Sequence, residues 1–293
     1  MSDGMIQSSY VGPQVEKCLG QPGCGSILGV FHHGWYLDCG GQVLLLHNTG
    51  YGRVPFGIGV DGFEACIPYR KELEGSEIQW ENGVLTIPCA DRSITLCPAD
   101  EPPLRPFDSG ALYEMVPMAE GLLEQEGSGY LRTLLPFANE IVRGQNPSLS
   151  GDLYLTRSVE ALAAFFRAMA EGEAVLEEAL RKMVGFGTGL TPSLDDWLVG
   201  FLYVLLRQRE LSQTAALCCL VSRLLSENRT NRISAAYLKA AAEGLYFESL
   251  QRAGEACGRE DLRPLMEVGS SSGSDMLTGM LFAAHYLEHR NGA

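Results

Sequence analysis

A glycine-rich segment that ends in two adjacent aspartates is the part of the sequence best suited to chemistry. It contains, in order, Gly185, Gly187, Gly189, Thr191, Pro192, Ser193, Asp195 and Asp196. Glycines at a spacing of two let the backbone turn sharply and approach a ligand closely. Thr191 is a typical N-cap residue and Pro192 fits the first helical position, so we predict a helix N-terminus whose free N–H groups favour an anion. The predicted substrate- or phosphate-binding residues here are Gly187, Gly189, Thr191 and Ser193.

The two aspartates lie in the first turn of that predicted helix, where the helix dipole stabilises a carboxylate. Asp195 and Asp196 point roughly 100° apart around the helix, so we expect one to face solvent and the other to face the protein interior. An interior carboxylate costs free energy unless it binds something. A well-capped helix connection without a ligand is the competing interpretation.

A second segment repeats the pattern 79 residues later, since Asp275–Gly279 and Asp196–Gly200 both read Asp-x-Leu-x-Gly. In each copy the Asp and the Gly lie on one helical face, and the Gly allows another backbone to approach there. We therefore predict that two similar helix N-termini converge on one pocket. The predicted catalytic residues are Asp195, Asp196 and Asp275, and Ser272 and Gly273 are predicted to bind substrate.

A third candidate segment lies between these two copies and begins at Thr230. Thr230 is expected to cap a helix whose first two turns carry Arg232 and Ser234. Arg232 would supply the positive charge that an anionic substrate needs, although a solvated arginine is the common alternative. Both side chains are predicted to bind substrate.

The elements that must position these residues fall into two classes. Before residue 100 the apolar runs are short, β-branched and aromatic, which predicts strands at 26–31, 35–37, 42–47, 63–68, 78–80, 84–88 and 93–96. A hairpin is expected around Asn82 and Gly83. Farther on, apolar residues recur with helical period, which predicts helices at 111–126, 158–170, 173–183, 193–207, 212–226, 233–244 and 275–289.

The proline-rich stretch 97–106 separates the part of predicted strands from the part of predicted helices, because prolines exclude a continuous helix or a central strand. The predicted fold class is α+β. A small antiparallel, barrel-like β domain (residues 1–107) is followed by an all-α helical bundle domain (residues 108–293) that carries the glycine and aspartate motifs.

Composition narrows the class of protein. The 293 residues carry 22 basic and 36 acidic side chains, a formal net charge of −14, and the deficit is spread over both halves of the chain. This argues against a nucleic-acid or anionic-membrane partner. The first ten residues lack the features of a secretory signal, and nine cysteines without a CxxC pair indicate reduced thiols. We expect a cytoplasmic protein without a membrane span.

The motifs together resemble the signature of a bacterial family whose best-known member is AllH, a subunit of the oxamate carbamoyltransferase of anaerobic allantoin breakdown. The resemblance rests on Gly-x-Gly-Leu-Thr-Pro-Ser-x-Asp-Asp at 187–196, Thr-x-x-Ile-Ser-x-x-Tyr-Leu at 230–238 and Ser-Gly-x-Asp-x-Leu-x-Gly at 272–279. Two positions depart from the family pattern. Leu194 replaces a small or polar residue, and Ser270 replaces a histidine that the family commonly has.

The resemblance implies a role in purine degradation, namely phosphorolysis of an N-carbamoyl compound: oxalurate and phosphate give oxamate and carbamoyl phosphate. It also implies partner subunits and a small anionic substrate. The aspartates would then orient the carbamoyl amino group, or Asp196 and Asp275 would hold a Mg²⁺ that bridges the phosphate. Two other hypotheses stay open: a stand-alone Mg²⁺-dependent phosphate-ester or glycosidic hydrolase, and a non-catalytic module that binds a small anion or another subunit.

Overall fold

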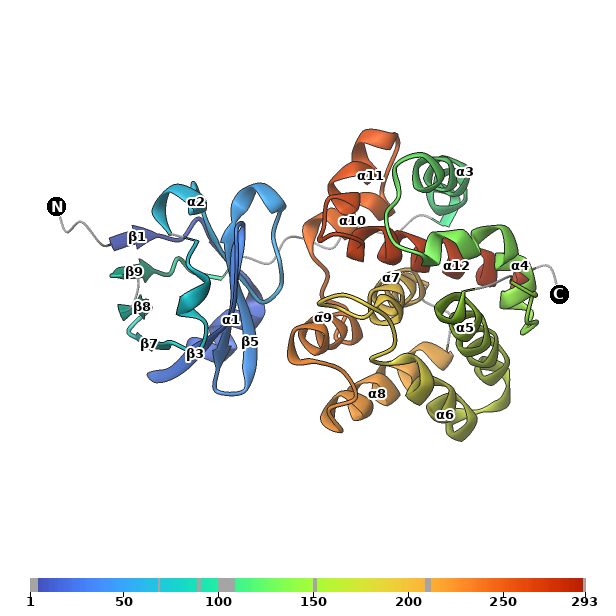
Figure 1. The fold of residues 1–293 in the computed structure, drawn as a ribbon, viewed down its shortest axis with the longest axis horizontal. Helices are drawn as coiled ribbons and strands as arrows, with labels where there is room; N and C mark the ends of the chain where they lie inside the picture. Colours follow the sequence, from blue (N-terminus) through green and yellow to red (C-terminus); the bar gives the residue numbers. More distant parts are fainter. Residues whose placement is uncertain are drawn as a thin grey trace. The chain divides into compact units, whose positions relative to one another are not determined.

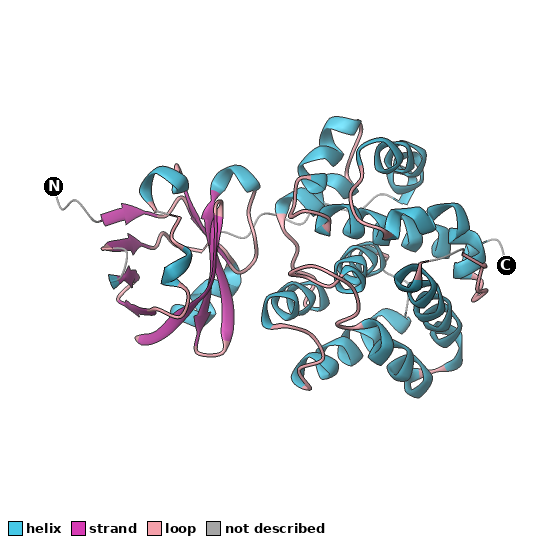
Figure 2. Ribbon diagram, viewed as in Figure 1, coloured by secondary structure: helices cyan, strands magenta, loops and turns pink. Residues whose placement is uncertain are grey.

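The computed structural model of the protein describes residues 5–67, 69–88, 91–99, 109–149, 152–208 and 212–291. The chain divides into two compact units, Met1–Arg105 and Pro106–Ala293. The predicted α+β class is confirmed, with a sheet in the first unit and helices in the second (Figures 1 and 2). The predicted boundary between residues 107 and 108 lies outside the described residues, as does most of the proline-rich stretch.

The first unit is built on a nine-stranded sheet that curls into a half-barrel, in the order β1-β9-β8-β7-β3-β4-β5-β6-β2. Its strands are β1 (Met5–Gln7), β2 (Tyr10–Val11), β3 (Gly23–Phe31), β4 (Gly34–Cys39), β5 (Gln42–Asn48), β6 (Gly57–Val60), β7 (Glu77–Glu81), β8 (Val84–Ile87) and β9 (Arg92–Thr95). Most neighbours pair antiparallel, as expected, whereas β1 pairs with β9 and β5 with β6 in parallel.

Alternation of side chains explains the sheet locally. In β7, Ile78 and Trp80 are buried while the residues between and beside them are exposed, so one face covers the core. The turn that joins β7 to β8 has left-handed φ values of 51° at Asn82 and 74° at Gly83. These values match the two-residue turn that asparagine–glycine favours, so the predicted hairpin is confirmed.

One predicted strand is wrong. Residues 63–66 of the expected strand 63–68 form a short helix, α2 (Phe63–Cys66), which follows Gly62 in the left-handed conformation. A run of four apolar-rich residues is too short to show a helical period, which is why the pattern was ambiguous. The first unit also contains α1 (Pro13–Leu19) and the short 3₁₀ helices η1 (Thr49–Tyr51) and η2 (Lys71–Leu73).

The second unit is helical. Its elements are α3 (Ser109–Glu126), η4 (Leu131–Phe137), α4 (Ala138–Val142), α5 (Leu153–Glu171), α6 (Glu173–Met183), α7 (Ser193–Arg207), α8 (Ser212–Ser226), α9 (Arg232–Ala242), α10 (Glu248–Gly254), α11 (Arg259–Met266) and α12 (Ser272–Asn291). Each of the seven predicted helices is present. The shorter α4, α10, α11 and η4 were not predicted.

Helix α7 forms the centre of this unit and packs against α9 and α12 (Figure 1). Every residue from Ser193 to Leu205 is buried, including Trp197 and Phe201, whose rings stack with a centroid separation of 4.8 Å. The apolar residues from Trp197 to Leu205 therefore belong to a core helix. Among the described residues, no helix combines the length and the apolar character that crossing a membrane requires.

Candidate functional site

Helices α7 and α12 approach each other through the two glycines of the repeated motif. A Cβ atom added to Gly200 would overlap the carbonyl oxygen of Met276, and one added to Gly279 would overlap the carbonyl oxygen of Trp197. The contact is reciprocal, because Trp197 follows Asp196 and Met276 follows Asp275. Only glycine allows two helix backbones to lie this close.

This crossing brings the two helix N-termini together, whereas the pocket that the sequence analysis expected between them stays a prediction. The Thr191 hydroxyl donates to Oδ2 of Asp196 at 2.8 Å and lies 2.9 Å from the Ser272 hydroxyl at the start of α12. Asp196 and Asp275 are also close enough for the charge of Asp275 to disfavour ionisation of Asp196. The structure thus gathers Thr191, Asp196, Ser272 and Asp275 in one cluster.

Asp275 is the least satisfied polar side chain of this cluster. It is fully buried, and neither carboxylate oxygen has a hydrogen-bond partner of standard geometry among the described residues. The hydroxyl of Ser193 and the N–H of Leu131 approach it and favour its charged form, but burial outweighs them and raises the pKa of Asp275 to about 7. A buried carboxylate with two free oxygens is expensive unless a ligand satisfies it.

Asp196 shares this environment. Only 1% of its surface is exposed, and burial raises its pKa to about 8; the Thr191 and Ser272 hydroxyls oppose this rise, and the charge of Asp275 adds to it. At pH 7 Asp196 is therefore mostly protonated and Asp275 close to half-protonated. Carboxyl groups with pKa values near the working pH are suited to proton transfer.

Asp195 plays a different part, and the expectation that one of the two adjacent aspartates faces solvent is wrong, because both are buried. Its Oδ1 accepts the N–H of Gly185 at 2.8 Å, and its Oδ2 accepts the hydroxyls of Thr230 at 2.5 Å and Ser234 at 2.6 Å. These donors lower its pKa, although burial raises it overall. Asp195 thereby ties the glycine loop to the start of α9.

The start of α9 also differs from the prediction, because Asp195 is buried and bonds to this segment. Thr230 does not cap the helix, because its hydroxyl is used by Asp195. Asn231 is the N-cap, and its side chain accepts the N–H groups of Ile233 and Ser234. Arg232 is the first residue of α9 and is exposed, whereas the predicted binding residue Ser234 is buried against Asp195.

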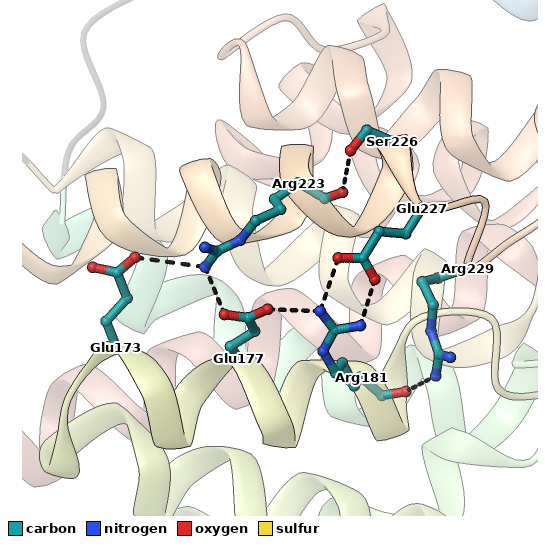
Figure 3. A network of polar contacts seen from close by, with 7 residues as sticks. All are labelled: Glu173, Glu177, Arg181, Arg223, Ser226, Glu227 and Arg229. Atoms are coloured by element: carbon teal, nitrogen blue, oxygen red, sulfur yellow. Dashed lines mark hydrogen bonds and ion pairs between the residues drawn. The ribbon is translucent and has the colours of Figure 1, made fainter.

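An ion-pair network holds the segment before Thr230 in place (Figure 3). Arg223 of α8 pairs with Glu173 and Glu177 of α6, and Arg181 of α6 pairs with Glu177 and Glu227. Arg229 then donates to the Arg181 carbonyl oxygen at 2.6 Å. Such partly exposed pairs stabilise weakly one by one, but a shared network orders the chain that delivers Thr230 to Asp195.

The glycine loops close back onto their helices more than the sequence predicted. Gly187 and Gly189 have φ values of 130° and 101°, and a Cβ at Gly187 would overlap the backbone nitrogen of Ser193. The N–H of Leu194 donates to the Phe186 carbonyl at 3.0 Å, and the N–H of Gly273 donates to the Val268 carbonyl at 3.0 Å. These backbone donors are already occupied, so the cluster is richer in carboxyl and hydroxyl groups than in free N–H groups.

Sequence reasoning missed the segment that covers Asp275. Gly129, with φ 78°, lies so close that an added Cβ would be 3.1 Å from Oδ1 of Asp275. The next residue, Tyr130, has a buried hydroxyl without a standard hydrogen-bond partner among the described residues, and it lies near Ser158, Ser193 and Asp275. The Gly-Ser-Gly-Tyr run at 127–130 was the available signal, since it interrupts the helical pattern.

The cluster offers two carboxyl groups and several hydroxyls for a metal. Within the parts of the chain that the structure describes, no three His, Cys, Asp or Glu side chains form a set that would hold a metal ion. A Mg²⁺ held by Asp196 and Asp275 would have to complete its shell with substrate oxygens and water. The donor set therefore gives no particular support to a resident metal.

Comparison with known proteins confirms the family resemblance. Residues 183–284 match the family described as oxamate carbamoyltransferase subunit AllH. The matched stretch contains α7, α9 and the first part of α12, to residue 284, and so includes Asp195, Asp196 and Asp275; it excludes the first unit and Tyr130. No solved structure matches the chain.

Proposed function

From the match to a carbamoyltransferase subunit, we propose that this chain contributes the carbamoyl-binding site of an oxamate carbamoyltransferase-like complex. The proposed reaction is phosphorolysis of oxalurate, or its reverse. A phosphate oxygen forms a bond to the carbamoyl carbon, and the bond from that carbon to the nitrogen of the oxamate part breaks. The phosphate proton ends on that nitrogen, so that oxamate and carbamoyl phosphate are the products.

The pair of unpartnered oxygens on Asp275 is the observation that carries this proposal. A carbamoyl group ends in an NH₂ that has two donors, and one carboxylate can accept from such a group. Binding would supply the hydrogen bonds that a fully buried side chain lacks in the free protein. The complex would therefore be strongly stabilised relative to the free protein and substrate. The same contacts would turn the carbamoyl carbon toward the attacking phosphate.

Asp196 is proposed to handle the proton. With a pKa of about 8 it holds a proton at neutral pH, and the Thr191 and Ser272 hydroxyls connect it to the other helix. A carboxyl group of this kind can give a proton to the leaving nitrogen and recover one from the incoming phosphate. Asp195, whose oxygens are fully engaged, acts as a positioning residue.

Access to Asp275 would require the 127–130 segment to move, because Gly129 and Tyr130 cover the carboxylate. Such a movement would also let the complex close over its substrate and exclude water. The Tyr130 hydroxyl would then be placed to donate to the developing oxyanion at the carbamoyl carbon.

The direct test is the variant Asp275→Asn, assayed in the assembled complex by formation of carbamoyl phosphate. We expect kcat/KM to fall by at least about 100-fold, since an amide cannot accept both N–H groups with the same strength. The control is Asp91→Asn, the same chemical change at an exposed turn residue with φ 52°, which asparagine tolerates. If Asp275→Asn and the control are both fully active, the substrate does not bind at this cluster and the proposal is wrong.

A further inference from the structure

A concave site lies in the helical unit away from the carboxyl cluster. A hollow of about 520 Å³ is bordered by the C-terminal ends of α4, α5 and α12 and by the first turn of α8. Arg143, Arg167, Arg290 and His289 line it, against a single acidic residue, Glu171. In a chain with a net charge of −14, such a concentration of basic side chains around one hollow is unusual.

Two of the guanidinium groups are fixed by neutral partners. Arg167 donates to the Gly144 carbonyl, and Gly144 has φ 77° with its Cα so close to the Arg167 side chain that a Cβ would overlap it. Arg290 donates to Gln213 at 2.8 Å and to the Tyr286 hydroxyl at 3.2 Å. Both side chains are held in place without losing their charge.

Carboxylates do not neutralise this group. None of the three arginines forms an ion pair with a carboxylate of the described residues. Helix C-termini favour nearby basic residues, which accounts for Arg143 at the end of α4 and for His289 and Arg290 in the last turn of α12. It does not account for three arginines around the same hollow, which repel one another unless an anion lies between them.

We propose that this hollow binds a small multivalent anion that carries phosphoryl groups. Guanidinium groups bind phosphate oxygens through paired N–H donors, and fixed guanidinium groups lose little entropy on binding. The volume lies within the range of small-molecule sites. The rings of Phe166 and Tyr286 supply an apolar floor, so a diphosphate with an organic part fits better than a lone phosphate.

The test is isothermal titration of the full chain with inorganic pyrophosphate, with Arg143→Gln and Arg290→Gln as variants. Arg143 is exposed, so its replacement should leave the fold intact. We expect each variant to raise Kd at least tenfold and added NaCl to raise it further. Lys239→Gln is the matched control, because it removes one exposed charge on α9, and it should bind as the unmodified chain does.

Three outcomes would overturn the proposal. The first is a Kd for pyrophosphate that Arg143→Gln and Arg290→Gln leave unchanged. The second is loss of binding in Ser272→Ala instead, which would place the anion at the carboxyl cluster. The third is tighter binding of citrate than of pyrophosphate, which would assign the hollow to carboxylates. This inference is independent of the proposed carbamoyl transfer, because Asp275→Asn should leave pyrophosphate binding intact.

Discussion

Three buried aspartates of similar sequence context have three different hydrogen-bonding states. Asp195 accepts from three donors, Asp196 accepts from the Thr191 hydroxyl with the Ser272 hydroxyl also nearby, and Asp275 has no standard partner among the described residues. Their sequence neighbourhoods place all three in the first turns of helices, so the pattern could mark them as candidates but could not rank them. The ranking depends on Gly185, Thr230 and Ser234, which reach Asp195 only after folding.

This difference predicts effects of very different size when the two aspartates are substituted. Asp195→Ala should lower the free energy of unfolding by at least about 3 kcal/mol, because it leaves buried donors without an acceptor. Asp275→Asn should lower the free energy of unfolding by no more than about 1 kcal/mol, because no standard hydrogen bond is lost. Urea denaturation of both variants measures the two values. Equal destabilisation by both would contradict the assignment of Asp195 as the positioning residue.

The raised pKa values also predict a pH dependence of stability. Asp196 and Asp275 have pKa values of about 8 and about 7 in the fold, above the ordinary value of 3.8, so the folded state binds more protons than the unfolded state between these limits. Their contribution to stability is present below pH 3.8 and is lost as pH rises through 7 and 8, at up to about 1.4 kcal/mol per pH unit for each group.

The measurement is the free energy of unfolding between pH 6.5 and 8.5. This window avoids the buried His47, whose pKa is lowered from 6.5 to about 4 and whose effect has the opposite sign at lower pH. We expect a decrease of at least about 1 kcal/mol in the unmodified chain and a flatter curve for Asp275→Asn. A curve of the unmodified chain that is flat or rises across the window would show that these carboxyl groups are ionised in the fold.

At the scale of elements, the long periodic segments were predictable and the short ones were not. Helix α6 was predicted with its observed bounds, Glu173–Met183, because eleven residues show the helical period clearly. Helices α10 and α11, with seven and eight residues, are defined by packing against α3 and each other instead. Strand β6 (Gly57–Val60) was not predicted either, because it is short and two of its four residues are glycine, which is rare in strands.

The closeness of α7 and α12 gives a test at this scale. Gly200→Ala and Gly279→Ala should each lower the free energy of unfolding by more than about 2 kcal/mol, because the new methyl group would overlap backbone of the facing helix. Gly121→Ala in α3 is the control, since its Cβ would meet only the flexible end of Arg259. It should stabilise the protein by up to about 1 kcal/mol through helix propensity. Thermal unfolding of the three variants measures these differences. If Gly200→Ala proves as stable as Gly121→Ala, the close backbone packing of α7 and α12 is wrong.

At the scale of the whole molecule, the family match covers residues 183–284 and does not extend to the nine-stranded unit. The α+β class followed from the change of period near residue 100, whereas the parallel pairings of β1 with β9 and β5 with β6 did not. Such pairings join segments far apart in sequence, and no local pattern specifies them.

The proposed role as a subunit predicts how activity depends on assembly. The purified chain alone should form no carbamoyl phosphate, and activity should appear when the partner subunits are added. Treatment of the assembled complex with a chelator should leave most of the rate, because Asp196 and Asp275 are proposed to act on the carbamoyl group and a proton. Chelator-sensitive hydrolysis by the chain alone would favour a Mg²⁺-dependent hydrolase instead.

The reciprocal glycines have a further consequence for how the carboxyl cluster can change over time. Backbone atoms of α7 and α12 are in direct contact at Gly200 and Gly279. The distance between Asp196 and Asp275 is therefore set by the two helix backbones and not by neighbouring side chains. Residues near the aspartates in sequence, such as Ser270 or Leu194, can therefore be exchanged without moving the two carboxyl groups apart. Substitutions around the carboxyl cluster could therefore change which substrate is bound, whereas Gly200 and Gly279 themselves tolerate almost no substitution.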